Sequence, residues 1–261
     1  MDTPSSPMMI VSAGFPSPGD EYKEPPLDLH RLLGFAGEDS FCHLMGTNQL
    51  SAAGITQHDL LVVTPTLDAR HNDIVVAQIN NGVVARRLIR FRDVTFLVPE
   101  DPANPNWPRI NVMPTDHFRI LGVVLCSIHP LNEFARNQLG NGQKQDVNDL
   151  LGLNRPEIFC VRVRGSSMQP AGIHDADVLV VDRGREAREN DIIIASLDGA
   201  FFVKRFVKSL GAIFLLSDNP LSAPIAVSSQ RFSIWGVVMQ SVHLIHQALH
   251  PHPIKQGRTL R

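Results

Sequence analysis

Two residues of this sequence, Ser167 and Lys204, have the types and surroundings that nucleophilic catalysis needs. Ser167 lies in the tetrapeptide Gly-Ser-Ser-Met (165–168), and Lys204 lies among apolar residues in Phe-Val-Lys-Arg-Phe (202–206). A serine hydroxyl becomes a nucleophile when a base takes its proton, and a neutral lysine can be that base. Burial against apolar side chains lowers the pKa of a lysine from its usual value of about 10.4. On composition alone, a turn serine and a surface lysine on a strand fit these residues as well.

The chain that must position these residues has 261 residues, of which 43% are hydrophobic. That length predicts one large domain or two ordinary ones, with enough apolar material for a core. With 24 basic and 26 acidic residues the net charge is −2, which excludes the whole-chain basic field of a general nucleic-acid binder. Cys42, Cys126 and Cys160 are too few and too scattered for a disulfide framework, so a reducing cytoplasm is expected.

Neither a membrane helix nor a signal peptide is expected. No apolar run approaches the roughly 18–20 residues that a membrane helix needs. Val-Ser-Ala-Gly (11–14) resembles a signal cleavage site, but the apolar stretch before it is only Met-Met-Ile-Val (8–11). A secretory signal has an apolar region of about 7–15 residues, so the arm is assigned another role.

The segment that holds the Ser-Lys pair repeats an earlier segment at an offset of 118 residues. Across positions 28–102, 23 of 75 residues are identical without a gap when compared with 146–220. Four extra residues around Trp107 then interrupt the first copy, and the register resumes at Phe118 and Phe232. Chance would give roughly one identity in sixteen, so the sequence contains two copies of one fold.

Each copy has the pattern of a compact, mainly β fold. Short apolar runs rich in β-branched residues, separated by turn residues at roughly 8–12-residue spacing, favour mostly antiparallel strands. In the second copy the expected strands are Val178–Val181, Ile192–Ala195, Phe201–Val207, Ala212–Leu216 and Ile234–Val242. A short helix is expected at Leu29–Leu33, ending at Gly34.

The predicted domain organisation has five parts. An N-terminal arm (1–27) precedes the first copy (28–130), a linker (131–145) follows, and then come the second copy (146–246) and a tail (247–261). The polar linker stretch 137–144 contains two glycines, which indicates flexibility, while the part around Phe134 could pack on a domain.

The second copy resembles the LexA/UmuD family of self-cleaving serine peptidases. The resemblance rests on Gly-Ser-Ser-Met (165–168), the following Gly-Ile (172–173) and Asp-x-Leu (177–179), and Val-Lys-Arg (203–205). It extends to the arm, where Gly-Phe-Pro-Ser-Pro (14–18) and the acidic stretch after it resemble UmuD, an accessory subunit of an error-prone polymerase. Family members cut their own chain at an Ala–Gly or Cys–Gly bond before the catalytic domain.

This resemblance implies a role for each residue of the pair. Ser167 would be the nucleophile, Lys204 the general base, and the bond between Ala13 and Gly14 the cleavage site. Backbone amides near Ser166 and Ser167 are candidates for holding the oxyanion.

The first copy lacks this chemistry. Gln49 stands where the second copy has Ser167, and Arg86 stands where it has Lys204. A glutamine amide is no nucleophile, and an arginine with a pKa above about 12 cannot act as a neutral base. The first copy is therefore expected to keep the fold without the activity. In turn, the second copy is preceded by Leu-Asn (131–132) in place of a cleavage motif.

The two departures suggest a fused pair of subunits. The resemblance implies homodimers in which the arm of one subunit can enter the partner's active site. Here the two copies would form an intramolecular pseudo-dimer, and the arm would lie extended in the cleft of the second copy. Ser167 would attack the carbonyl of Ala13, leaving a product of 248 residues that begins at Gly14. Tethering makes this pairing independent of protein concentration.

The function implied is that of an autoproteolytic accessory factor of the SOS DNA-damage response. Expected partners are a RecA–single-stranded DNA filament and a translesion DNA polymerase subunit. One alternative is a binding module for either partner that never cuts, and another is a damage-responsive repressor. An arm of 27 Pro-rich residues is too short for a repressor's helix-turn-helix domain, and a Ser-Lys signal peptidase would need a membrane anchor.

Other clusters give weaker signals. Basic segments around Arg86–Arg92 and Arg183–Arg188 could touch DNA or an acidic protein, but a solvated strand or turn fits them better. His243, His246, His250 and His252 have no accompanying HExxH or paired-cysteine motif, so no metal site is predicted. No cofactor is expected, because Walker-A and dinucleotide glycine patterns are missing from the sequence.

Overall fold

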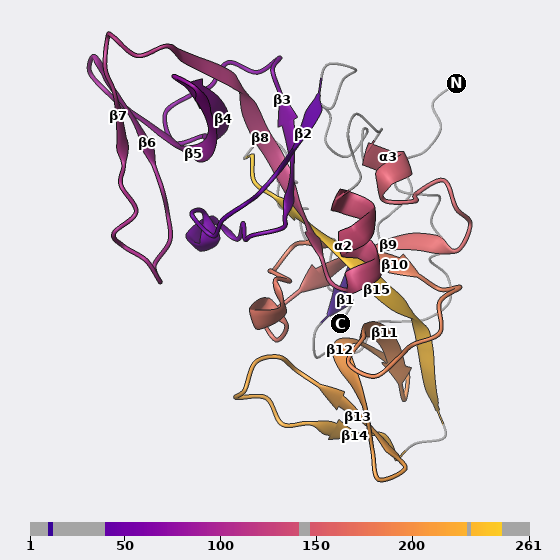
Figure 1. Cartoon of the computed structure of the whole chain (residues 1–261). Coiled ribbons are helices and arrows are strands. Elements are labelled where there is room, and N and C mark those ends of the chain that lie inside the picture. Colours follow the sequence, from indigo (N-terminus) through magenta and orange to yellow (C-terminus); the bar gives the residue numbers. More distant parts are fainter. Residues whose placement is uncertain (1–9, 13–39, 141–146, 229–230, 247–261) are drawn as a thin grey trace, which may run out of the picture.

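The structure is a computed structural model that describes residues 10–12, 40–140, 147–228 and 231–246. It confirms the predicted mainly β fold, since both copies consist of short, mostly antiparallel strands (Figure 1). The helix expected at Leu29–Leu33 lies outside the described residues. At the equivalent place in the second copy the structure has the short helix α3 (Val147–Leu150).

The two copies have matching strand orders. The strands of the first copy are β2 (Phe41–Leu44), β3 (Leu60–Thr64), β4 (Ile74–Ile79), β5 (Gly82–Phe91), β6 (Val94–Val98), β7 (Ile110–Val112) and β8 (Phe118–Pro130). Those of the second copy are β9 (Ile158–Arg164), β10 (Val178–Asp182), β11 (Ile192–Leu197), β12 (Ala200–Ser209), β13 (Ala212–Leu216), β14 (Ile225–Ala226) and β15 (Phe232–Leu244). A 3-10 turn follows the first strand of each copy, namely η1 (Ser51–Ala53) and η2 (Gln169–Ala171).

The duplication extends to irregularities of the sheet. The β3–β8 pairing shifts register between Val62 and Val63, and the β10–β15 pairing shifts between Val180 and Val181, which are the equivalent residues. Both long strands also carry a glycine at a close backbone approach. A Cβ on Gly122 would lie 2.6 Å from the Thr64 carbonyl oxygen, and the equivalent Gly236 is similarly crowded. The repeated Gly-Val-Val segments therefore need glycine on steric grounds.

The two copies join through β8 and β15, which pair antiparallel with Ile128 opposite Val242. One core cluster is shared across this junction, with Cys126 and Ile128 from the first copy and Val180 and Val242 from the second. All four side chains are fully buried. The copies thus form the intramolecular pseudo-dimer expected from the duplication.

The part of the linker around Phe134, which was expected to be able to pack on a domain, forms the helix α2 (Glu133–Gly140). This helix also includes residues 137–140 of the stretch predicted to be flexible. The Asn132 side chain accepts a hydrogen bond from the Ala135 amide (2.9 Å), which satisfies a free donor of the first turn. Ala135 and Leu139 are buried, and α2 packs on β8 and β15. Tertiary packing therefore overrides the polar composition. Phe134 is 46% exposed, with the Arg185 guanidinium 5.0 Å from its ring centroid.

Within the described residues, no helix is both long enough and apolar enough to cross a membrane.

Candidate active site

Ser167 and Lys204 lie side by side in the second copy. Ser167 is in the turn between β9 and η2, and Lys204 is in the middle of β12. The Nζ atom of Lys204 lies 3.0 Å from the Oγ atom of Ser167. Lys204 is only 4% exposed, and its neighbours Val203 and Phe206 are buried as well. Burial lowers the pKa of Lys204, because the charged ammonium loses its hydration. The arrangement can support proton transfer from the serine hydroxyl to a neutral amine.

A second hydroxyl, which sequence reasoning missed, also contacts the lysine. The Nζ atom of Lys204 donates a hydrogen bond to the Oγ atom of Ser217 (2.9 Å). Ser217 directly follows β13, and β13 pairs with β12 so that Leu216 lies opposite Arg205. The only sequence signal was this hairpin, which returns the chain to β12 thirteen residues after Lys204.

The backbone near Ser167 is shaped for close approach of a substrate. Gly165 has a φ of 95°, a conformation that favours glycine, and its amide donates to the Asp175 carboxylate (2.7 Å). Among the described residues, the amides of Ser166 and Ser167 donate to no acceptor. These two donors remain available for an oxyanion, so their assignment as oxyanion donors stays a prediction.

A short piece of the N-terminal arm lies next to this site. Strand β1 (Ile10–Ser12) pairs in parallel with β9 (Figure 1). In this pairing Ser12 lies opposite Arg164. The same strand contacts β12, which carries Lys204. Ala13 and Gly14, the predicted cleavage site, lie outside the described residues. Ser12, which directly precedes Ala13, thus lies opposite a residue of β9 that is three positions before Ser167 in the sequence.

The equivalent position in the first copy has no such pair. Gln49 and Arg86 are both buried, and the Arg86 guanidinium donates to the Ala85 carbonyl through Nη1 (2.7 Å). Pro99 stands at the place of Ser217. The Gln49 amide is no nucleophile and the Arg86 guanidinium is no base, so the first copy lacks both groups at the positions equivalent to Ser167 and Lys204.

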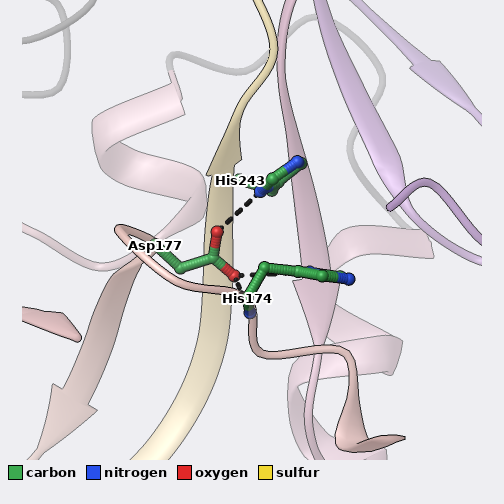
Figure 2. Close-up of side chains that lie close together, drawn as sticks. All are labelled: His174, Asp177 and His243. Carbon is green, nitrogen blue, oxygen red and sulfur yellow. Dashed lines mark hydrogen bonds and ion pairs between the residues drawn. The ribbon is translucent and has the colours of Figure 1, made fainter. Parts of the chain in front are cut away.

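A second group of polar residues lies at the junction of the copies. Asp177, which is 1% exposed, accepts a hydrogen bond from His243 Nδ1 (2.7 Å) (Figure 2). It also accepts hydrogen bonds from Ser241 Oγ (2.7 Å) and from the His174 amide (2.7 Å). The His174 ring lies beside the same carboxylate, with Nδ1 3.7 Å from it. The histidine contacts lower the pKa of Asp177, although burial acts in the opposite direction.

This group has an equivalent in the first copy, where Asp59 and His129 Nδ1 are 2.6 Å apart and Thr56 replaces His174. His174, Asp177 and His243 bring three possible metal ligands within 4.8 Å of one another. However, the Asp177 oxygens already accept three hydrogen bonds, and the first copy builds the same Asp-His pair with no second histidine. The Asp-His pair that both copies share is therefore interpreted as a structural contact at the junction of the copies and not as a metal site. His250 and His252, from the predicted histidine cluster, lie outside the described residues.

Because of the His174–Asp177 ion pair, the free energy of unfolding is expected to depend on pH. The Asp177 carboxylate raises the pKa of His174. The ion pair therefore stabilises the fold below the ordinary histidine pKa of about 6.5, and this contribution is lost as the pH rises through the raised value. In urea unfolding, the wild type is expected to lose more stability than His174→Thr between pH 6 and pH 8. Equal losses in the two proteins would contradict the assignment. Thr56 shows that threonine fits this position of the fold.

A cleft of about 540 Å³ is lined by residues of both copies, and neither Ser167 nor Lys204 is among them. Gly54 and His129 of the first copy line it, together with Gly172, His174 and Arg205 of the second. On β12, Lys204 faces Ser167, whereas the next residue, Arg205, borders this cleft. Successive side chains of a strand point to opposite faces, so β12 presents Lys204 to Ser167 on one face and Arg205 to the cleft on the other.

Comparison with known proteins adds an independent finding. A family model described as Peptidase S24-like matches residues 7–125 and again residues 132–239. The LexA repressor of Ectopseudomonas mendocina (strain ymp) is 42% identical over 73 residues, which cover 28% of this chain and 36% of the relative. The LexA repressor of Bordetella petrii is 40% identical over 93 residues, covering 35% and 41%. Protein ImpA of Salmonella typhimurium is 34% identical over 116 residues, covering 44% of this chain and 74% of the relative. The chain thus spans about two fifths of the length of these LexA repressors.

Proposed function

Because the chain belongs to the Peptidase S24-like family, which it matches twice in tandem, we propose that it is a serine peptidase that cuts its own arm between Ala13 and Gly14. One observation carries this proposal: Ser167 and Lys204 are 3.0 Å apart beside the strand β9, and β9 pairs with the arm residues that immediately precede Ala13. The strand that leads to the proposed cleavage bond and the proposed catalytic pair thus lie on neighbouring elements of one chain.

The proposed reaction uses only protein groups and water. Neutral Lys204 accepts the hydroxyl proton of Ser167 while the Oγ atom attacks the Ala13 carbonyl carbon. The amides of Ser166 and Ser167 hold the resulting oxyanion. When the bond to Gly14 breaks, the Lys204 ammonium protonates the leaving nitrogen. Residues 1–13 then remain as an ester on Ser167 until water, deprotonated by Lys204, releases them with a free carboxyl group.

The biological setting of this proposal is the SOS DNA-damage response. The UmuD-like features of the arm and the match to LexA repressors and ImpA support it. We infer that a RecA–single-stranded DNA filament stimulates the cut and that the product associates with a translesion DNA polymerase. The repressor alternative is less well supported, because the chain covers only 36% and 41% of the two LexA repressors.

A non-cleaving binding module remains the second candidate, and the first copy favours it. That copy has lost both catalytic residue types but retains the complete strand order of its partner. A domain that keeps its fold but lacks the catalytic residues can still act in pairing or in binding.

The two functions are separated by the intact mass of the purified chain. After incubation at alkaline pH, or with a RecA filament, the wild type is expected to lose residues 1–13 and leave a chain of 248 residues. Alkaline pH favours the reaction because it neutralises Lys204. Ser167→Ala is expected to remain whole under the same conditions. A wild type that stays whole under both conditions would refute the peptidase and favour the binding module.

A further inference from the structure

We propose that Ser217 is a positioning residue for the self-cleavage, holding the Lys204 amine so that its lone pair faces the Ser167 hydroxyl. The inference rests on the proposed function, since it assigns a part in that reaction. It concerns a residue outside the Ser-Lys pair, at the end of a different strand.

The geometry at the lysine supports this role. The Nζ atom lies 3.0 Å from Ser167 Oγ and 2.9 Å from Ser217 Oγ. A neutral amine has one lone pair and two N–H groups. When one N–H donates to Ser217, the amine has a fixed rotation about its last bond, and the lone pair can accept the hydrogen of Ser167. Without Ser217, a lysine that is 4% exposed has little access to water that could hold the amine instead.

Three successive residues fasten the turn after β13 to the site. Ser217 contacts Lys204, and Asp218 pairs with Arg205, the next residue of β12. The amide of Asn219 donates to the Ser167 carbonyl (3.0 Å). This segment (217–219) therefore links the strand of the base to the turn of the nucleophile, so that the distance between them is held from both sides.

The first copy separates what the fold needs from what the chemistry needs. There Glu100 pairs with Arg87 at 2.6 and 2.8 Å, as Asp218 does with Arg205. The amide of Glu100, the residue equivalent to Asp218, donates to the carbonyl of Gln49, the residue equivalent to Ser167. The backbone link of the first copy therefore starts one residue earlier than the link that Asn219 makes in the second.

The copy that has no Ser-Lys pair thus keeps the ion pair and also has a backbone link to the turn of Gln49, made by the amide one residue earlier. What the first copy lacks is the hydroxyl, because Pro99 occupies the place of Ser217. The turn folds without this hydroxyl, which therefore serves the lysine and not the fold.

The experiment measures the first-order rate of self-cleavage against pH for the full chain, with Ser217→Ala and Ser217→Thr. Ser217→Ala is expected to cut roughly 10- to 100-fold more slowly, because a misplaced catalytic group costs about that much. Its pH midpoint is expected to move to lower pH, since a hydroxyl oxygen that accepts from the lysine stabilises the ammonium form. Ser217→Thr keeps the hydroxyl and is expected to restore most of the rate and the wild-type midpoint.

Asp218→Asn serves as the matched control, because it weakens the same turn without touching Lys204. It is expected to leave the pH midpoint unchanged. If Ser217→Ala cuts at the wild-type rate, or is slowed with an unmoved midpoint as a loosened turn would be, the inference is overturned while the peptidase stands. If the wild type itself never cuts, the proposed function fails and the inference with it.

Discussion

Replacing Lys204 with arginine is expected to slow self-cleavage by about 10²- to 10⁴-fold while the chain stays folded. The magnitude is that of losing a general base, and arginine cannot supply a neutral nitrogen at any ordinary pH. Folding is expected to survive because the equivalent Arg86 of the first copy is buried in the same fold, with its guanidinium bonded to a backbone carbonyl. Intact mass against time gives the rate, and thermal unfolding checks the fold.

The reverse change in the first copy provides the control. Arg86→Lys is expected to leave the rate unchanged, because Gln49 offers no hydroxyl there. If Lys204→Arg cut as fast as the wild type, Lys204 would not be the base. If Arg86→Lys altered the rate, the division of labour between the copies would be wrong.

Replacing Val11 with proline is expected to slow the cut by about a hundredfold. Val11 is the central residue of β1, opposite Val163 of β9. Proline removes a backbone N–H and fixes φ, so it disrupts the pairing that holds the arm beside Ser167. A displacement of about 1 Å at the reacting carbonyl is enough for this loss.

The measurement is the first-order rate of the full chain, with Val11→Thr as the control. Threonine keeps both the N–H and the β-branched side chain, so a rate close to the wild type is expected. If Val11→Pro and the wild type cut equally fast, pairing of β1 with β9 would play no part in presenting the Ala13 carbonyl.

Much of the fold could be predicted from the sequence because most strands coincide with short local runs of apolar residues. β10 is buried at every position, and its first four residues, Val-Leu-Val-Val (178–181), are a continuous apolar run that precedes Asp182. The repeat then predicted the same strands in the first copy and the loss of chemistry at Gln49 and Arg86. Ser167 and Lys204 can be predicted as a catalytic pair because the short motifs around them, Gly-Ser-Ser-Met (165–168) and Val-Lys-Arg (203–205), resemble those of the LexA/UmuD family.

The missed features depend on contacts between distant segments. α2 forms because Leu139 and Ala135 find a buried surface made by β8 and β15, which no local pattern records. Ser217 reaches Lys204 only through the register of a hairpin. The Asp177–His243 pair needs a loop and a strand 66 residues apart to meet. Each is decided by tertiary packing, which overrides composition.

The central claim is that the second copy cuts the arm of its own chain. It is tested most directly by mixing the unlabelled wild type with an ¹⁵N-labelled Ser167→Ala chain at alkaline pH and measuring both intact masses over time. The unlabelled chain is predicted to lose residues 1–13 at a rate independent of total concentration, while the labelled chain stays whole. A labelled chain that loses its arm, or an unlabelled chain that keeps it, would contradict the claim.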